Sequence, residues 1–136
     1  MPQTEIATMT YSLPKLVNEN GGQTRIFIPK YGIINERRHQ LHEVIRLSGL
    51  NLVVNDLDMP LIIKVASIPK ERIQVYFIDN EEYFKRKSTF TDKDGNLFED
   101  NDERAIFFTK LIFCKISTES ELRFWIVWYS PSFALI

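Results

Sequence analysis

Two histidines are the first candidates for chemistry in this sequence. His39 and His42 stand three residues apart beside Glu43, and two imidazoles on one face of a helix could hold a metal ion. The chain contains no third histidine, and its one cysteine, Cys114, does not follow at a ligand spacing. We therefore interpret both imidazoles as solvated side chains at the edge of a loop and predict no metal site.

An alternating acidic run is the second candidate. Asp92, Asp94 and Asn96 alternate within Thr91–Asn96, which is the pattern of oxygen ligands at the start of a calcium loop. The glycine of this run, Gly95, comes one place before the third ligand and not after it, where the calcium loop needs its sharp turn. The segment is therefore predicted to be a turn.

The composition describes one soluble globular domain. The 136 residues are 44% hydrophobic and 26% charged, which is enough apolar material for a core. A net charge of −1 without a dense block of Lys and Arg argues against a nucleic acid or a membrane surface as a partner. The single Cys114 lies in an apolar run and is predicted to be a reduced core thiol, which suits a cytoplasmic protein. The start of the chain lacks the basic and apolar regions of a signal peptide.

The elements that could position chemistry begin with the segment Thr24–Arg38. A short β-rich run, Arg25–Ile28, stops at Pro29 and turns at Gly32, which predicts a buried strand followed by a loop at its carboxyl end. Ligands bind at that end of the strands in open α/β sheets.

A helix is predicted before this strand. Ile6, Met9, Leu13 and Val17 are spaced to line one helical face, and Gly21-Gly22 follows as the stop signal. Pro14, within this helix, is expected to bend or restart it. Helix, double glycine and strand form half of a β-α-β unit, so the fold class is α/β.

A β-rich block follows. Short strands are predicted at Val44–Leu47 and Asn51–Val54, a turn at Asn55–Pro60, and the clearest strands at Leu61–Ser67 and Arg72–Ile78. We expect these strands to form antiparallel hairpins inserted in the α/β chain. In the last strand, alternation predicts that Ile73, Val75 and Phe77 form a buried face. The opposite, more polar face is predicted to consist of Arg72, Gln74 and Tyr76.

Two further helices complete the pattern. A short helix is predicted at Glu81–Lys87, and a heavily buried one from Glu103 to about Lys115. The residues Asp100 to Glu103 provide a cap and an acidic first turn for the second of these helices.

Three blocks in this order resemble a known family. PKYG after a strand, YFID followed by EYFKR, and EDNDERAIFF opening a helix are similar to the N-terminal domain of bacterial glycogen/starch synthase, the retaining ADP-glucose glucosyltransferase. The resemblance covers roughly Thr4–Lys110. It implies an incomplete Rossmann-like N-terminal domain of a two-domain glycosyltransferase of the B type. In that fold the glucan meets the N-terminal half and the nucleotide sugar is held mainly by the C-terminal half.

Four substrate-binding candidates follow from the resemblance. Asp100 and Asn101, with Arg104, match the Asp-Asn-x-x-Arg motif of the family, where the aspartate lies near the sugar-binding cleft. A carboxylate can accept two hydroxyl hydrogen bonds, although Asp100 could equally serve as a helix cap. Thr4 and Glu5 stand where most members have a lysine and glycines near the diphosphate. We therefore expect these two residues to line the cleft but assign them no contact with the diphosphate.

The tail departs from the family pattern. Residues 1–110 are interpreted as a partial starch synthase N-terminal catalytic domain and residues 111–136 as an apolar tail packed on it. This tail lacks the expected His-x-His-x-Trp, and its Trp125 and Trp128 are predicted to be core residues of a strand instead of a sugar platform.

The resemblance therefore implies a truncated enzyme. We expect no catalytic residue and no cofactor in this chain, since the groups that stabilise the leaving diphosphate belong to the C-terminal half. ADP-glucose and an α-glucan are the partners implied for the full-length family. The alternatives are a remnant that binds glucan or a partner protein without catalysis, and a chain without function whose tail arose from a change of reading frame. The apolar tail also predicts self-association.

Overall fold

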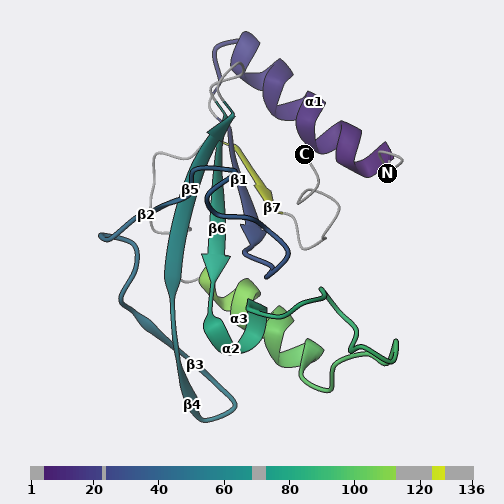
Figure 1. Ribbon diagram of the computed structural model, residues 1–136. Helices are drawn as coiled ribbons and strands as arrows, with labels where there is room; N and C mark the ends of the chain where they lie inside the picture. Colours follow the sequence, from purple (N-terminus) through teal and green to yellow (C-terminus); the bar gives the residue numbers. More distant parts are fainter. Residues whose placement is uncertain (1–4, 23, 69–72, 113–123, 128–136) are drawn as a thin grey trace.

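The computed structural model describes residues 5–22, 24–68, 73–112 and 124–127, and Figure 1 shows a mixed α/β arrangement of one large sheet, a small hairpin and three helices. In chain order the elements are α1 (Glu5–Glu19), β1 (Thr24–Pro29), β2 (His42–Glu43), β3 (Asn51–Val54), β4 (Leu57–Pro60), β5 (Ile62–Ile68), β6 (Ile73–Asp79), α2 (Glu81–Phe84), α3 (Asn101–Leu111) and β7 (Phe124–Val127). Within the described ranges, no helix combines the length and apolar character that a membrane span requires.

The large sheet joins parallel and antiparallel strands. Its order is β2-β5-β6-β1-β7, with β1 parallel to both β6 and β7, while β5 is antiparallel to β6 and to β2. The strands β3 and β4 form a separate antiparallel pair. The predicted α/β class with inserted hairpins is therefore confirmed, and the strands expected at Leu61–Ser67 and Arg72–Ile78 are found within one residue as β5 and β6.

The parallel pair β1 and β6 forms the centre of the core. Ile26 and Ile28 of β1 are fully buried, and Phe27 stands opposite Tyr76 of β6. The prediction that Tyr76 lies on a polar face was wrong. Its ring is buried because it stacks on Phe27 with centroids 5.2 Å apart, and the guanidinium of Arg25 lies 5.5 Å from the ring centroid. Strands inside a parallel sheet are usually covered on both faces, so buried residues do not alternate with exposed ones along them.

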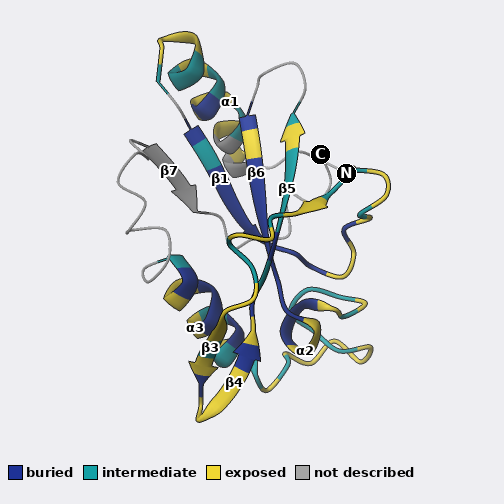
Figure 2. Ribbon diagram, turned by 90° about the vertical axis from the view of Figure 1, so that its left-hand side faces the viewer, coloured by how far each residue is buried: buried dark blue, intermediate teal, exposed yellow. Residues whose placement is uncertain are grey.

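The buried face of α1 also differs from the prediction. Met9 and Leu13 are 68% and 51% exposed, whereas Pro14 is buried and Tyr11 is half-buried. The helix continues through Pro14 without interruption, and α1 contacts β1 and β6 (Figure 2). Because the proline ring packs inward, the helix is turned so that two of the residues expected in the core point to its outer side. The stop at the double glycine is confirmed, with Gly21 at φ +83°.

The segment Val44–Leu47, expected as a strand, is a turn. The amide of Leu47 donates to the carbonyl of Val44 at 3.1 Å, and the amide of Ser48 donates to the same carbonyl at 3.0 Å. The chain pairs with β5 two residues earlier, at His42 and Glu43. His42 is thus on a strand and His39 is in a turn, so the two imidazoles do not share a helical face.

The hairpin β3-β4 is longer than its composition indicates. Asn55 and Asp56 both have positive φ angles, of 50° and 60°, which is the backbone of a two-residue type I′ turn. Only these two residues turn, and Leu57–Pro60, expected to be part of the turn, pairs with β3 as strand β4. The hairpin then packs against α3.

The remaining elements follow their predictions closely. The helix α2 ends at Phe84 instead of Lys87, and α3 begins at Asn101 instead of Glu103. Thr91–Asn96 is the expected turn, closed by a bridge between Thr91 and Leu97. The expected helix end near Lys115, together with Cys114 and Trp128, lies outside the described residues.

Gly32, at the end of the PKYG motif, is required by space. A Cβ added there would stand 2.7 Å from the amide nitrogen of Arg86 and closer still to its carbonyl oxygen. The loop after β1 and the segment after α2 therefore meet main chain to main chain, which only glycine permits.

We predict that Gly32→Ala lowers the free energy of unfolding by about 3 kcal/mol, because neither backbone can move away from the added methyl. Urea unfolding followed by circular dichroism measures this. The control is Gly95→Ala, where the φ of +85° is strained but nothing lies within 4 Å, so a loss of only about 1 kcal/mol is expected. Equal losses in the two variants would contradict the contact between Gly32 and Arg86.

Candidate functional site

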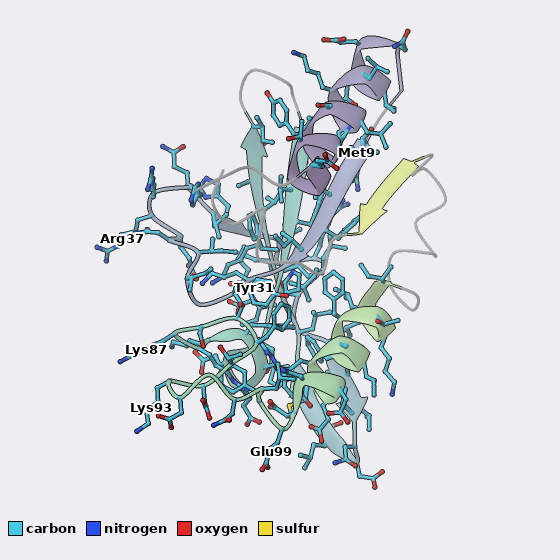
Figure 3. The ribbon with its side chains drawn as sticks, turned by 90° about the vertical axis from the view of Figure 1, so that its right-hand side faces the viewer. Met9, Tyr31, Arg37, Lys87, Lys93 and Glu99 are labelled. Atoms are coloured by element: carbon cyan, nitrogen blue, oxygen red, sulfur yellow. The ribbon has the colours of Figure 1, made fainter. Side chains whose placement is uncertain are left out.

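The candidate site lies beyond the carboxyl ends of β1 and β6. The loop after β1, the helix α2 and the start of α3 converge there (Figure 1), and Tyr31 of that loop lies at the middle of the molecule (Figure 3). We call the polar side chains gathered at this point the α3 junction; they are Tyr83, Arg86, Asp100, Asn101, Glu103 and Arg104.

Asp100 is held by a forked ion pair. Arg86 Nη1 donates to Asp100 Oδ1 at 2.7 Å, and Arg86 Nη2 donates to Oδ2 at 2.5 Å. These hydrogen bonds hold the pKa of the Asp100 carboxyl below its ordinary value, and the same contact raises the pKa of Arg86. Asp100 occupies the cap position of α3 but its side chain makes no cap hydrogen bond, so it does not serve as a side-chain cap.

Arg86 is fixed by more than its carboxylate partner. Its Nε and Nη2 donate to the carbonyl of Glu82 at 3.2 and 2.8 Å, which ties the guanidinium to the last turn of α2. The guanidinium carbon also lies 4.6 Å from the ring centroid of Phe98, within the range of a cation-π contact.

Arg104 connects α3 to α2 from inside the protein. Its side chain is 0% exposed, its Nε donates to the carbonyl of Tyr83 at 2.7 Å, and its Nη1 donates to Asn101 Oδ1 at 2.7 Å. Asn101 Nδ2 in turn donates to the carbonyl of Phe90 at 2.9 Å. The two side chains of the Asp-Asn-x-x-Arg motif that follow Asp100 thus hold the loop and the helix together.

Aromatic rings surround the buried guanidinium. Its carbon lies 5.5, 5.9 and 5.4 Å from the ring centroids of Phe84, Phe90 and Phe98. The buried ring of Tyr31 meets Phe84 and Phe90 edge to face, at 6.0 and 5.8 Å. These contacts connect the PKYG loop to the α3 junction and provide cation-π stabilisation in a site without water exposure.

Tyr83 and Glu103 close the side of the junction nearest the hairpin. Tyr83 donates its hydroxyl to Glu103 Oε2 at 3.1 Å, and Asn55 Nδ2 donates to Oε1 at 3.1 Å. Burial, reinforced by the hydrogen bond to Glu103, raises the pKa of Tyr83 to about 12.

A second group of charges holds the loop after β1. Glu36 Oε1 lies 3.1 Å from Lys30 Nζ and 2.7 Å from Lys64 Nζ, and Lys64 Nζ lies 3.1 Å from Asp79 Oδ2. The hydrogen bond from Lys64 lowers the pKa of Glu36. Burial opposes the charged form of Lys64, but the hydrogen bonds that its ammonium donates to Glu36 and Asp79 outweigh this desolvation and raise its pKa. This chain of ion pairs connects the PKYG loop to β5 and β6.

The other sequence-derived candidates lie elsewhere. Glu5 is exposed in the first turn of α1, and Thr4 lies outside the described residues. Asp100 and Asn101 are adjacent at the start of α3, whereas Glu5 begins α1, and Figures 1 and 2 show these two helices apart from each other. The backbone of Trp125 pairs with Arg25 in β7, which places it in a strand as expected.

Comparison with known proteins identifies the family. The family model for the starch synthase catalytic domain matches residues 3–126. The chain belongs to this family. The match runs past Lys110 and ends at residue 126, within β7.

Curated relatives carry the name glycogen synthase. The protein of Chlorobium limicola is 42% identical over 104 residues, and that of Chlorobium phaeobacteroides is 43% identical over 104 residues; each match covers 76% of this chain and 21% of the relative. The glycogen synthase of Chlorobaculum tepidum is 42% identical over 107 residues, or 78% of this chain and 22% of its own length. This chain thus spans about a fifth of the relatives it matches. No solved structure matches it.

Sequence reasoning missed two parts of the site. Nothing in the spacing of the EYFKR block indicates which of its cations contacts Asp100, 14 positions further along the chain. Lys30 and Lys64 likewise meet Glu36 only after the sheet forms. A cation directly after a buried strand, as Lys30 is, is the one local signal that could have been used.

We predict that Arg104→Met lowers the free energy of unfolding by about 3 kcal/mol, because it leaves the Tyr83 carbonyl and Asn101 Oδ1 without their donor. Arg104→Lys is expected to lose nearly as much, since one ammonium cannot reproduce the fork. Urea midpoints measure both, with Arg37→Met on the exposed loop as the control. A midpoint for Arg104→Met equal to that of the control would contradict the role of Arg104.

We also predict a loss of stability in alkali that Tyr83→Phe removes. The folded pKa of about 12 exceeds the ordinary value of 10.0, so this contribution is complete below about pH 10 and lost as pH rises through 12. The difference in unfolding free energy between wild type and Tyr83→Phe, measured at about pH 9 and about pH 11, should shrink at the higher pH. A difference that stays constant would show that the Tyr83 hydroxyl is not held protonated.

Proposed function

We propose that this chain is the acceptor-side part of a retaining glucosyltransferase that moves glucose from ADP-glucose to the non-reducing end of a 1,4-α-glucan. The observation that carries the proposal is the family match over residues 3–126, together with relatives named glycogen synthase at 42–43% identity. The parallel pair β1 and β6, with polar loops at its carboxyl ends, supports a Rossmann-like N-terminal half of a two-domain enzyme of the B type.

The substrate contacts proposed here are those of the motif at the start of α3. The Asp100 side chain is 30% exposed, and a carboxylate has about four lone-pair positions, of which Arg86 uses two. The remaining positions can accept sugar hydroxyls. Asn101 supports this edge of the site, and the resemblance alone assigns Thr4 and Glu5 to the lining of the cleft.

Donor binding is assigned to the remaining part of the full-length enzyme. Departure of a nucleoside diphosphate requires fixed positive charge at the developing anion. Lys30, Lys64 and Arg86 are each engaged by carboxylates. We therefore propose that the isolated chain does not catalyse transfer, and that the full-length enzyme is cytoplasmic.

A binding role without catalysis is the second candidate. Three large apolar side chains of α1 are exposed, and such residues mark surfaces that contact partners; they are Met9, Leu13 and Leu16. Size-exclusion chromatography at several concentrations tests whether copies of the chain associate.

We predict that the purified chain cosediments with glycogen and incorporates no label from ADP-glucose. Binding needs only the acceptor side, whereas transfer needs the donor side as well. Ultracentrifugation with glycogen and a radiolabel assay measure the two properties on the same preparation. Incorporation of label would refute the claim of inactivity, and failure to sediment would refute the acceptor-side assignment.

A further inference from the structure

We propose that Arg86 is a positioning residue that orients the Asp100 carboxylate toward an acceptor sugar. This inference rests on the proposed function and adds to it the residue that acts through Asp100. It is carried by the forked contact between the two side chains and by the way in which Arg86 is itself fixed.

The fork sets the plane of the carboxylate. Two parallel hydrogen bonds, one to each oxygen, leave Asp100 no free rotation about its terminal bond. The lone pairs that Arg86 does not use then point to the opposite edge of the carboxylate, and the side chain is partly exposed. A sugar with two adjacent hydroxyl groups fits such an edge, because both hydroxyls can donate to it.

Arg86 is placed before any ligand arrives. The carbonyl of Glu82 accepts two of its hydrogen bonds, Phe98 lies under its guanidinium, and Gly32 lies against its main chain. The carbonyl and the ring thus hold the Arg86 side chain, and Gly32 fixes the position of its main chain. A group held in this way does not lose conformational entropy on binding, which is the advantage of a preorganised site.

Two arginines have different roles here: Arg86 orients the Asp100 carboxylate, and Arg104 stabilises the fold. Arg86 is 23% exposed, and ion pairs at such positions contribute little to folding. Arg104 is fully buried and connects α2 with α3. Removal of Arg86 should therefore affect the direction of the Asp100 carboxylate far more than the stability of the fold.

The experiment measures binding of a soluble maltooligosaccharide to the full 136-residue chain by NMR titration. Arg86→Gln is expected to weaken binding about tenfold, the equivalent of one charge-assisted hydrogen bond. Arg86→Lys should recover part of the affinity, since an ammonium restores the charge but not the fork. Lys87→Gln, on the adjacent exposed residue, is the matched control and should bind as wild type does.

Two further measurements separate positioning from structure. The carboxyl carbon of Asp100 should titrate at a higher pH in Arg86→Gln than in wild type, while the urea midpoint changes little. Equal affinity of wild type and Arg86→Gln would overturn the role of Arg86 alone. A loss of affinity matched by a large fall in the urea midpoint would also overturn it, in favour of a structural role. Absence of binding by wild type would overturn the acceptor-side function and this inference with it.

Discussion

The buried cation of Arg104 holds the candidate site together. The guanidinium of Arg104 is fully buried, and desolvation of a charge is costly unless hydrogen bonds and polarisable groups replace the lost water. The carbonyl of Tyr83, the amide of Asn101 and three phenylalanine rings provide that replacement. Because these partners come from α2, from α3 and from the loop between them, the segments that carry the site can adopt only one mutual arrangement.

The same arrangement extends to the centre of the sheet. Tyr31, two residues beyond the end of β1, contacts two of the rings that surround Arg104. Gly32 then brings its backbone against Arg86, and the ion pairs of Glu36 with Lys30 and Lys64 secure the rest of the loop. The position of Asp100 is therefore set by the parallel pair β1 and β6 through a short series of direct contacts.

Local patterns were sufficient for elements whose environment is simple. The strands β5 and β6, the turn at Thr91–Asn96 and the acidic first turn of α3 follow from alternation, turn residues and charge. Val44–Leu47 has strand composition but forms a turn, because pairing with β5 is already made at β2. Leu57–Pro60 has turn composition but forms a strand, because two residues with positive φ complete the reversal.

Some residues of the candidate site can be recognised from a local motif, whereas others are identified only by contacts between distant parts of the chain. Asp100 and Asn101 are candidates from sequence because, with Arg104, they match a contiguous family motif that the structure places at the start of α3. Arg86 could not be assigned to Asp100, since that contact depends on where α2 ends and on the close approach at Gly32. Likewise, Tyr76 was placed on the wrong face because its partner Phe27 belongs to a strand 49 positions earlier, as the pairing register shows.

Charge compensation is the physical reason for the proposal that a nucleotide-sugar donor binds in another part of the full-length protein. At the carboxyl ends of β1 and β6, Lys30 and Lys64 share the carboxylate of Glu36, and Arg86 is paired with Asp100. A diphosphate at these cations would have to displace a carboxylate already bound at close distance. The partly exposed Asp100 carboxylate, in contrast, can accept hydroxyl groups without breaking any ion pair. This edge of the protein is thus suited to a neutral polyhydroxylated acceptor, which supports the proposal that the donor is held mainly by another part of the full-length enzyme.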